Sequence, residues 1–309
     1  MQRIALGAAF ALTLTAVLPA AAADIPESPL VTTDWLEANL DHPGIRIVEV
    51  SVEPGLFERG HIPGAQNVSW HTDLVETTVR DIAGPAKFEA LLQRLGIEED
   101  TTVILYGDNN NWFAAWGAWL FSYYDLEDNV KLLDGGRKKW EAENRPMSTR
   151  PAQVAASSIT LGEPRTEVRA LLPDVLAVVH GHNEAAILDI RSPDEFSGKI
   201  IAPAGVPELA IRAGHMPGAV NVPWSRAVAE DGTFLPVDEL KALYASVGID
   251  GTKPIITTCR IGERSSHSWF LLTRLLGFEA KNYDGSWTEY GNLVGVPVEN
   301  PAGTIWAAR

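Results

Sequence analysis

The sequence predicts an α/β protein with two similar domains, each a mainly parallel sheet flanked by helices. Two observations lead to this prediction. A set of short motifs occurs twice in the same order, and segments with strand and helix patterns alternate within each half. Because parallel strands need a crossover between them, this alternation favours a parallel sheet with helices on its faces.

The repeat is clearest at residues 60–70 and 214–224, which read GHIPGAQNVSW and GHMPGAVNVPW. His61 and His215 are therefore 154 positions apart (215 − 61). Two later motifs, at 95–97 and 133–135, recur at 247–249 and 283–285 with offsets of 152 and 150. A constant order at a nearly constant offset indicates a duplicated domain. Because the first half has no cysteine, we expect both histidines to be structural.

The elements of the first half are predicted from apolar spacing. Strands are expected at residues 45–50 and 102–106, and helices at 88–95 and 113–121. In the second half the same patterns predict strands at 186–190, 254–258 and 280–283 and helices at 240–247 and 266–276. Ser192, Pro193 and Glu195 form a helix-start signal, and Gly277 is a C-cap signal.

Composition limits the possible functions. The formal net charge of −15 disfavours nucleic-acid binding, because an acidic surface repels phosphates. A single cysteine, Cys259, excludes a disulfide framework within the chain. His180 and His182 form a pair without a third ligand nearby, and no nucleotide-binding glycine motif is present. We therefore expect neither a metal nor another cofactor.

Cys259 is the main functional clue. It directly follows the strand predicted at 254–258 and precedes a helix expected to start near Ser265, in the loop CRIGERSS. Gly262 allows a tight turn whose N–H groups can surround an anion, and Arg260 and Arg264 add positive charge. Together with the helix N-terminus these groups are expected to favour the thiolate. The alternative, a buried inert cysteine, predicts apolar neighbours instead.

These motifs resemble the rhodanese sulfurtransferases. Cys-Arg-x-Gly after a strand, with the upstream GHMPGAVNVPW, is similar to that family, and the tandem arrangement resembles thiosulfate and 3-mercaptopyruvate sulfurtransferases. The resemblance implies that Cys259 takes sulfur from thiosulfate as a persulfide and passes it to cyanide or a thiol. It also implies that the small-molecule donor is bound by the loop residues Arg260, Ile261, Gly262, Glu263 and Arg264.

The resemblance also covers Asp189-Ile190-Arg191-Ser192, which matches an Asp-x-Arg-Ser element of the family. It implies that Arg191 faces the loop and binds the anionic group of the donor. For Asp189, a structural role at the strand end and a role in fixing the loop remain open.

The loop departs from the commonest family patterns, so alternatives remain. Arg260 favours thiosulfate, but Ile261 stands where many thiosulfate enzymes have lysine, which leaves 3-mercaptopyruvate open. A sulfur carrier or binding module without turnover also remains possible. A cysteine phosphatase would need an arginine six positions after the cysteine, where this chain has Ser265.

The first half lacks the chemical apparatus. Asp108 stands where Cys259 would be, and Ser51 stands where Arg191 would be. Trp112, Trp116 and Trp119 share one helical face and are read as core, with the wall of an inter-domain cleft as the alternative. In the second half, Arg212 ends an insertion, where it could reach the donor or cap the loop.

The predicted organisation has four parts. Residues 1–23 form a secretory signal, 24–147 a non-catalytic rhodanese-like domain, 148–166 a linker and 167–309 the catalytic domain. The signal rests on Arg3, the apolar run at 4–18 and a small-residue cleavage site after Ala23. We therefore expect an exported, periplasmic monomer that is not attached to the membrane after cleavage.

Overall fold

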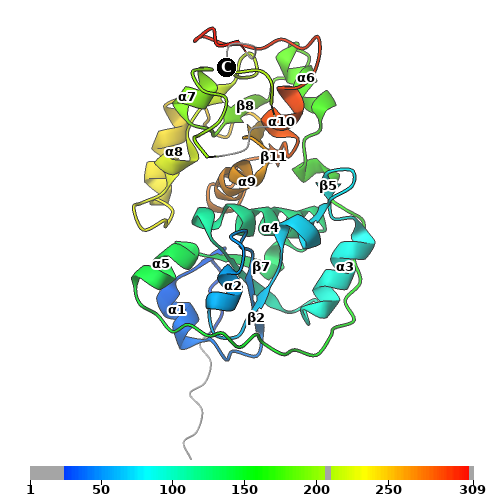
Figure 1. The fold of residues 1–309 in the computed structure, drawn as a ribbon, viewed down its shortest axis with the longest axis vertical. Helices are drawn as coiled ribbons and strands as arrows, with labels where there is room; N and C mark the ends of the chain where they lie inside the picture. The colour runs from blue at the N-terminus through cyan, green and yellow to red at the C-terminus, as the bar shows by residue number, and fades with distance from the viewer. Residues whose placement is uncertain (1–23, 206–209, 306–309) are drawn as a thin grey trace, which may run out of the picture.

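The computed structural model describes residues 24–205 and 210–305 and has two lobes, one for each half of the sequence (Figure 1). The first lobe holds a five-stranded sheet in the order β1 (Leu30–Val31), β7 (Val130–Leu133), β6 (Thr102–Tyr106), β2 (Ile45–Glu49), β3 (Ala65–Asn67). The second holds a four-stranded sheet in the order β11 (Ala280–Asn282), β10 (Ile255–Thr258), β8 (Ala186–Asp189), β9 (Val220–Asn221). All neighbouring strands in both sheets are parallel, which confirms the predicted fold class.

Helices surround each sheet. Those of the first lobe are α1 (Thr33–Ala38), α2 (Leu56–Arg59), α3 (Pro85–Arg94), α4 (Trp112–Tyr123) and α5 (Gly136–Ala142). Those of the second lobe are α6 (Leu172–Val179), α7 (Pro193–Phe196), α8 (Val237–Ala245), α9 (Glu263–Phe270) and α10 (Ser286–Tyr290). Among the described residues, no helix has the length and apolar character needed to cross a membrane. The predicted signal peptide lies outside the described residues.

Most predicted elements are present, with shifted ends. The strand predicted at 102–106 coincides with β6. The helix predicted at 266–276 begins earlier, at Glu263, and continues after α9 into a π-helical turn at Leu271–Leu275. The capping box predicted at Ser192 is present, since Glu195 N–H donates to Ser192 Oγ at 3.2 Å. A hairpin of β4 (Val75–Glu76) and β5 (Asp81–Ile82) was not predicted, because two-residue strands show no periodicity.

The segment predicted as a linker lies along the first lobe. From 149 to 165 it contains no helix or strand. It is nevertheless held at several points: Ser157 N–H donates to the Gln93 carbonyl at 2.9 Å, and Leu161 N–H to Glu89 Oε2 at 2.9 Å. Ile159 is buried in the core. The segment therefore belongs structurally to the first lobe.

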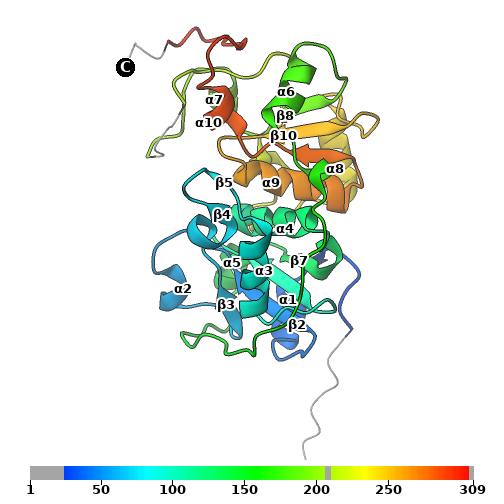
Figure 2. The same ribbon diagram turned by 90° about the vertical axis from the view of Figure 1, so that its right-hand side faces the viewer.

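The lobes meet along α4 and α9, which lie against each other in both ribbon views (Figures 1 and 2). One cluster of buried apolar side chains continues from the first lobe, through Trp116, into the second lobe, where it includes Leu188 and Cys259. The β4–β5 hairpin reaches the second lobe, where Asp81 pairs with Arg169 at 2.7 Å. These contacts bring first-lobe side chains to the carboxyl edge of the second sheet.

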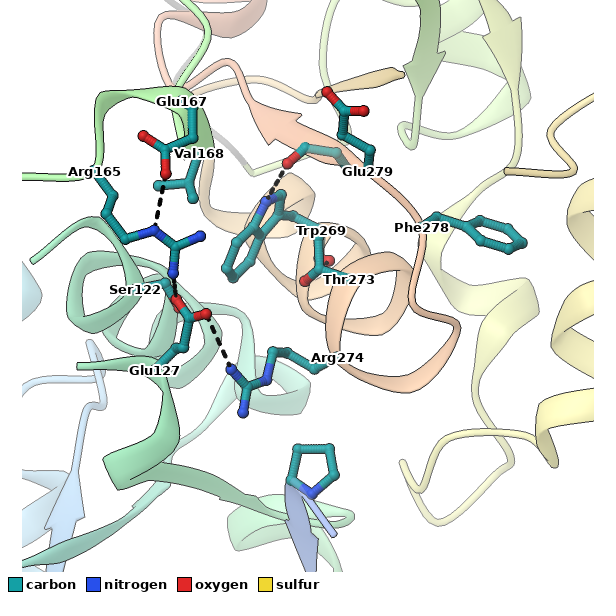
Figure 3. Close-up of a pocket in the computed structure, with 12 residues that line it drawn as sticks. Ser122, Glu127, Arg165, Glu167, Val168, Trp269, Thr273, Arg274, Phe278 and Glu279 are labelled. Carbon is teal, nitrogen blue, oxygen red and sulfur yellow. Dashed lines mark hydrogen bonds and ion pairs between the residues drawn. The ribbon is translucent and has the colours of Figure 1, made fainter. Parts of the chain in front are cut away.

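Ion pairs also fix the interface near the start of the second lobe. Glu127 lies between Arg165 and Arg274 and pairs with both (Figure 3). Arg165 also pairs with Glu167 at 2.9 Å. The pocket beside them, about 420 Å³, is lined by none of the residues of the Cys259 loop.

Candidate active site

Cys259 is positioned by the sheet of the second lobe. It follows β10 directly, and its backbone N–H donates to Ser286 Oγ at 3.1 Å at the start of α10. Its carbonyl accepts from Trp287 N–H at 3.1 Å. Because α9 begins at Glu263, residues 259–262 turn the chain from a strand into a helix at the carboxyl edge of the sheet. Open α/β sheets place their ligands at this edge.

Gly262 makes the tight turn possible. Its φ of +96° lies in the left-handed region, which favours glycine. A Cβ atom at this position would lie 2.7 Å from both Asp284 Cα and Trp116 Cζ3. Trp116 belongs to α4, so the first lobe packs directly on the cysteine loop.

The sulfur of Cys259 is enclosed by its own loop. The side chain is fully buried, with 0% of its surface exposed. Gly262 N–H donates to Sγ at 3.1 Å, and the thiol donates to Glu263 Oε2 at 3.3 Å. The same Glu263 oxygen accepts Ile261 N–H at 3.3 Å. Two loop N–H groups thus have acceptors at the cysteine, that of Gly262 the sulfur and that of Ile261 the Glu263 carboxylate.

The electrostatic balance at the thiol differs from the prediction. Burial raises the pKa of the Cys259 thiol above its ordinary value, and the negative charge of Glu263 raises it further. The charge of Arg264 and hydrogen bonds from Ser265 act in the opposite direction but are weaker. Burial first, and the nearby Glu263 carboxylate second, thus favour the thiol over the thiolate that the sequence predicted.

Arg264 is held by a buried carboxylate. Its Nη1 and Nη2 each donate to one oxygen of Glu195 at 3.1 Å, in the two-pronged geometry that suits guanidinium and carboxylate. Burial would raise the pKa of Glu195, but the hydrogen bonds and charge of Arg264 outweigh it, so this pKa lies below its ordinary value. Arg260 lies on the other side of Glu263, with Nη2 3.6 Å from Oε1. Both predicted loop arginines thus lie beside the cysteine.

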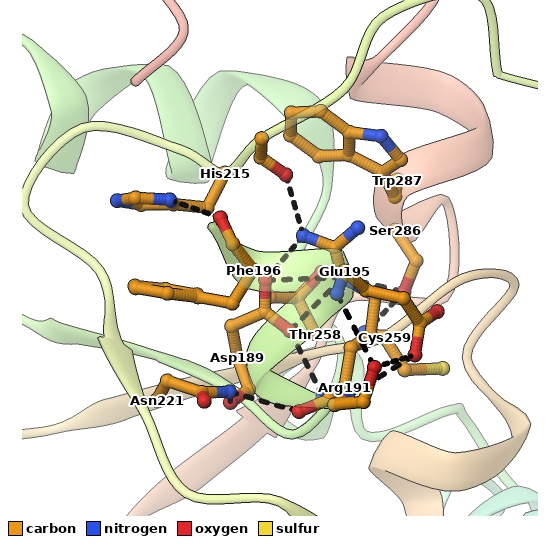
Figure 4. Close-up of polar contacts among 12 residues, drawn as sticks. Asp189, Arg191, Glu195, Phe196, His215, Asn221, Thr258, Cys259, Ser286 and Trp287 are labelled. Atoms are coloured by element: carbon orange, nitrogen blue, oxygen red, sulfur yellow. Dashed lines mark hydrogen bonds and ion pairs between the residues drawn. The ribbon is translucent and has the colours of Figure 1, made fainter. Parts of the chain in front are cut away.

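Arg191, unlike the loop arginines, does not lie beside the Cys259 sulfur (Figure 4). Its guanidinium donates to Asp189 Oδ2 at 2.6 Å and to the Gly214 carbonyl at 2.8 Å, and it stacks 4.7 Å from the Trp287 ring. Figure 4 shows it beside Trp287, with the Cys259 sulfur pointing away from it. The donor-binding role of Arg191 stays a prediction, but this placement favours a structural role for both Arg191 and Asp189.

The first lobe contains the same arrangement with different residues. Glu49 ends β2 as Asp189 ends β8, and Arg137 donates to it at 2.8 Å. Arg137 also donates to the Gly60 carbonyl, the counterpart of Gly214. An arginine that joins a strand-end carboxylate to the Gly-His element therefore exists in the lobe without a cysteine. This parallel supports the structural interpretation of Arg191.

The two repeated histidines are also structural. His61 stacks on Phe57 with ring centres 3.8 Å apart, and its Nδ1 lies 2.8 Å from the Phe57 carbonyl. His215 stacks on Phe196 at 3.6 Å, with Nδ1 2.6 Å from the Phe196 carbonyl. Both fix the start of the Gly-His element onto the preceding helix.

In the first lobe, side chains of the loop that corresponds to the cysteine loop are used in local hydrogen bonds. Asp108 accepts hydrogen bonds from Val52 N–H at 3.1 Å and Glu53 N–H at 2.9 Å. Asn111 accepts from Gly107 N–H and donates to the Leu133 carbonyl. The Asp108 carboxylate is thus used to hold a neighbouring turn, which supports a non-catalytic role.

Sequence reasoning missed a pocket beside Arg264. It is about 440 Å³ in volume and is lined by Trp112 of the first lobe and by Glu195, Trp224, Arg226 and Arg264 of the second. Trp112 and Trp224 meet edge to face at 4.9 Å. Trp224, which ends the repeated Gly-His element, begins a Trp-Ser-Arg motif, but the sequence alone does not show that a residue of the other lobe completes a pocket there.

The structure shows where the residues lie whose roles the sequence left undecided. Trp112 lines the pocket, Trp116 covers the loop at Gly262, and Trp119 is core, with its Nε1 donating to the Val168 carbonyl. Arg212 donates to the carbonyls of Tyr290, Gly291 and Val296. It caps the loop rather than facing Cys259.

The sequence matches the model of the rhodanese-like domain twice, at residues 32–143 and 172–293. It is 53% identical over 272 residues to a protein of Mycobacterium bovis named putative thiosulfate sulfurtransferase 1, covering 87% of this chain and 97% of that protein. It is 47% identical over 273 residues to the sulfur carrier protein TtuD of Thermus thermophilus, covering 87% and 95%.

Solved structures share the fold. The crystal structure of YnjE matches with a TM-score of 0.72 at 23% identity, covering 87% of this chain and 68% of that one. The wild-type structure of EanB matches with a TM-score of 0.74 at 22% identity, covering 88% and 69%.

Proposed function

Because the chain belongs to the rhodanese-like family and carries two such domains, we propose that it is a thiosulfate sulfurtransferase that carries sulfur as a persulfide on Cys259. The observation that carries the proposal is the position of Cys259. It is placed between the end of β10 and the start of α9, with Gly262 N–H 3.1 Å from its sulfur. The other lobe has Asp108 at this position, committed to its own turn.

The proposed reaction has two steps. The Cys259 thiolate attacks the outer sulfur of thiosulfate, an S–S bond forms, and sulfite leaves with the electron pair of the broken S–S bond. A thiophilic acceptor, cyanide or a thiol, then attacks the outer sulfur of the persulfide and returns the electron pair to Cys259. No cofactor is required by this chemistry.

Positive charge for the dianionic donor comes from the second lobe. Arg260 and Arg264 lie beside the cysteine loop, and Arg226 is exposed in the pocket next to Arg264. The amides of Ile261 and Gly262 can hold oxygens of the leaving sulfite. Because Cys259 is fully buried, the donor reaches the sulfur only when neighbouring side chains move, and opening of the Arg264–Glu195 pair would also free a guanidinium.

The decisive experiment is incubation with thiosulfate and cyanide, followed by measurement of thiocyanate. We expect turnover in the wild type and none in Cys259→Ser, with an unchanged circular dichroism spectrum. Mass spectrometry after thiosulfate should show one added sulfur atom that cyanide removes. Turnover in the serine variant would refute the persulfide mechanism.

The same experiment separates the alternatives. Higher kcat/KM with 3-mercaptopyruvate than with thiosulfate, measured side by side, would identify the other donor. A stable persulfide without catalytic turnover would indicate a sulfur carrier, the function named for the Thermus relative.

We further propose that the protein is exported to the periplasm and acts there as a monomer. The basis for export is the sequence of residues 1–23, with Arg3 before an apolar run and small residues before Asp24. Amino-terminal sequencing of the protein recovered from its host should begin at Asp24, and recovery of chains that retain the first 23 residues would contradict export by cleavage.

A further inference from the structure

Glu263 is the one acidic group among the described residues in hydrogen-bond contact with the Cys259 sulfur. Its Oε2 lies 3.3 Å from Sγ, and both side chains are buried. Gly262 N–H donates to Sγ at 3.1 Å, and Ser265 also donates hydrogen bonds to the sulfur, so these groups stabilise negative charge there rather than take the proton. A proton leaving the thiol in this closed arrangement therefore has the Glu263 carboxylate as its nearest acceptor.

The two carboxylate oxygens of Glu263 have different contact partners. Arg260 Nη2 and Arg264 Nε approach Oε1 at 3.6 and 3.8 Å. Oε2 is left to the thiol and to Ile261 N–H. Three further charged groups lie near the loop: Glu195 pairs with Arg264, Asp284 pairs with Arg169 at 2.8 Å, and Arg80 of the first lobe donates to the Asp284 carbonyl.

We propose that Glu263 is the catalytic base of the sulfur-transfer reaction, taking the proton of Cys259 as the sulfur attacks the donor. This inference rests on the proposed function. A thiolate beside an ionised Glu263 would place two buried negative charges 3.3 Å apart, which is strongly unfavourable. Moving the proton from Sγ to Oε2 keeps the pair at one negative charge, opposite the two arginines.

The proton and electron balance is complete within the site. The thiol gives its proton to Oε2, the Sγ–S bond forms, and sulfite leaves with the electron pair of the thiosulfate S–S bond. When the acceptor removes the outer sulfur, Sγ regains an electron pair and takes the proton back from Glu263. Protonation of Oε2 also weakens it as the acceptor of Ile261 N–H, so this amide can turn to the oxygens of sulfite.

The test is the pH dependence of persulfide formation in a single turnover with thiosulfate, followed by mass spectrometry. In Glu263→Gln we expect the rate at pH 6 to fall about 100-fold, the scale of a general base. The variant should then gain rate steeply as pH rises, because its proton must leave before attack. The wild type should show a flatter profile and a solvent deuterium isotope effect that the variant lacks.

Two variants serve as controls. Asp284→Asn removes another buried carboxylate near the loop that does not touch Sγ, so the shape of the pH profile should be unchanged. Glu263→Asp keeps a carboxylate and should recover part of the rate at pH 6. Thermal melting verifies that each variant is folded.

The outcomes distinguish the two proposals. If the wild type forms no persulfide with thiosulfate, the proposed function fails. If the wild type forms it and Glu263→Gln is as fast or faster at pH 6, Glu263 only repels the anionic donor and the inference is overturned.

Discussion

At the scale of single residues, Gly262 sets how closely the first lobe approaches the cysteine loop. Its left-handed backbone precedes the start of α9 at Glu263, and its missing side chain leaves room for Trp116. One position therefore satisfies a local turn and an inter-domain contact at the same time.

We expect Gly262→Ala to lower the free energy of unfolding by roughly 2–4 kcal/mol, because a strained φ and a clash with backbone add together. The matched control is Gly248→Ala, where φ is +83° but no atom lies within 4 Å of the added Cβ. Urea unfolding of both variants measures the difference. Equal losses would mean that Trp116 and Asp284 move aside without cost.

At the scale of elements, the ends of β2 and β8 carry equivalent ion pairs. Glu49 and Arg137 in the first lobe, like Asp189 and Arg191 in the second, are buried and joined to the carbonyl of a Gly-His element. Because the ion pair is also present in the lobe that has no cysteine, its role is to stabilise the fold.

Arg137→Ala and Arg191→Ala should therefore destabilise the protein by similar amounts, about 3–5 kcal/mol, since each leaves a buried carboxylate unpaired. Denaturant unfolding, with thiosulfate kinetics measured in parallel, checks this. A stable Arg191→Ala protein with a much higher KM for thiosulfate would restore the donor-binding role predicted from the resemblance.

The loop after β6 provides the corresponding test of the first lobe. Asp108→Ala removes the acceptor of Val52 and Glu53 N–H and should cost about 1.5–3 kcal/mol of stability. We expect kcat/KM for thiosulfate to change by less than about threefold. A loss as large as that of Cys259→Ser would show that the carboxylate takes part in the chemistry.

At the scale of the whole molecule, the two lobes share one core through α4 and α9, and the cysteine loop lies at their contact. The first lobe has no cysteine but covers the loop with Trp116 and supplies Trp112 to the neighbouring pocket. One lobe thus carries Cys259 and its loop, and the other forms part of the enclosure of that loop.

The variants Trp116→Ala and Trp140→Ala separate two roles of the first lobe, the enclosure of the cysteine loop and the packing of its own core. Both side chains are buried in the first lobe, and each loss should cost about 3–5 kcal/mol. Trp140 lies in the core away from the second lobe. We expect only Trp116→Ala to change the rate of Cys259 alkylation by iodoacetamide at a temperature where both variants are folded. Identical rates would mean that the first lobe does not restrict access to the sulfur.

The amino-acid sequence by itself determined the duplication, the parallel α/β class, most long elements and the place of Cys259 after a strand. These features depend on local spacing, on capping residues and on repeated motifs, all of which are visible along the chain. The shortest strands and the β4–β5 hairpin were missed because they are too short to show a period.

Only the tertiary structure decided which charged groups meet. The family resemblance implied that Arg191 faces the Cys259 loop, yet in the structure Arg191 pairs with Asp189. Glu263 approaches the sulfur instead, and Glu195 holds Arg264. The pocket residues Trp112 and Arg226 come from different lobes. The physical reason is that charge pairing and burial depend on distances of a few ångströms between segments far apart in sequence, and a strand-and-helix pattern does not contain those distances.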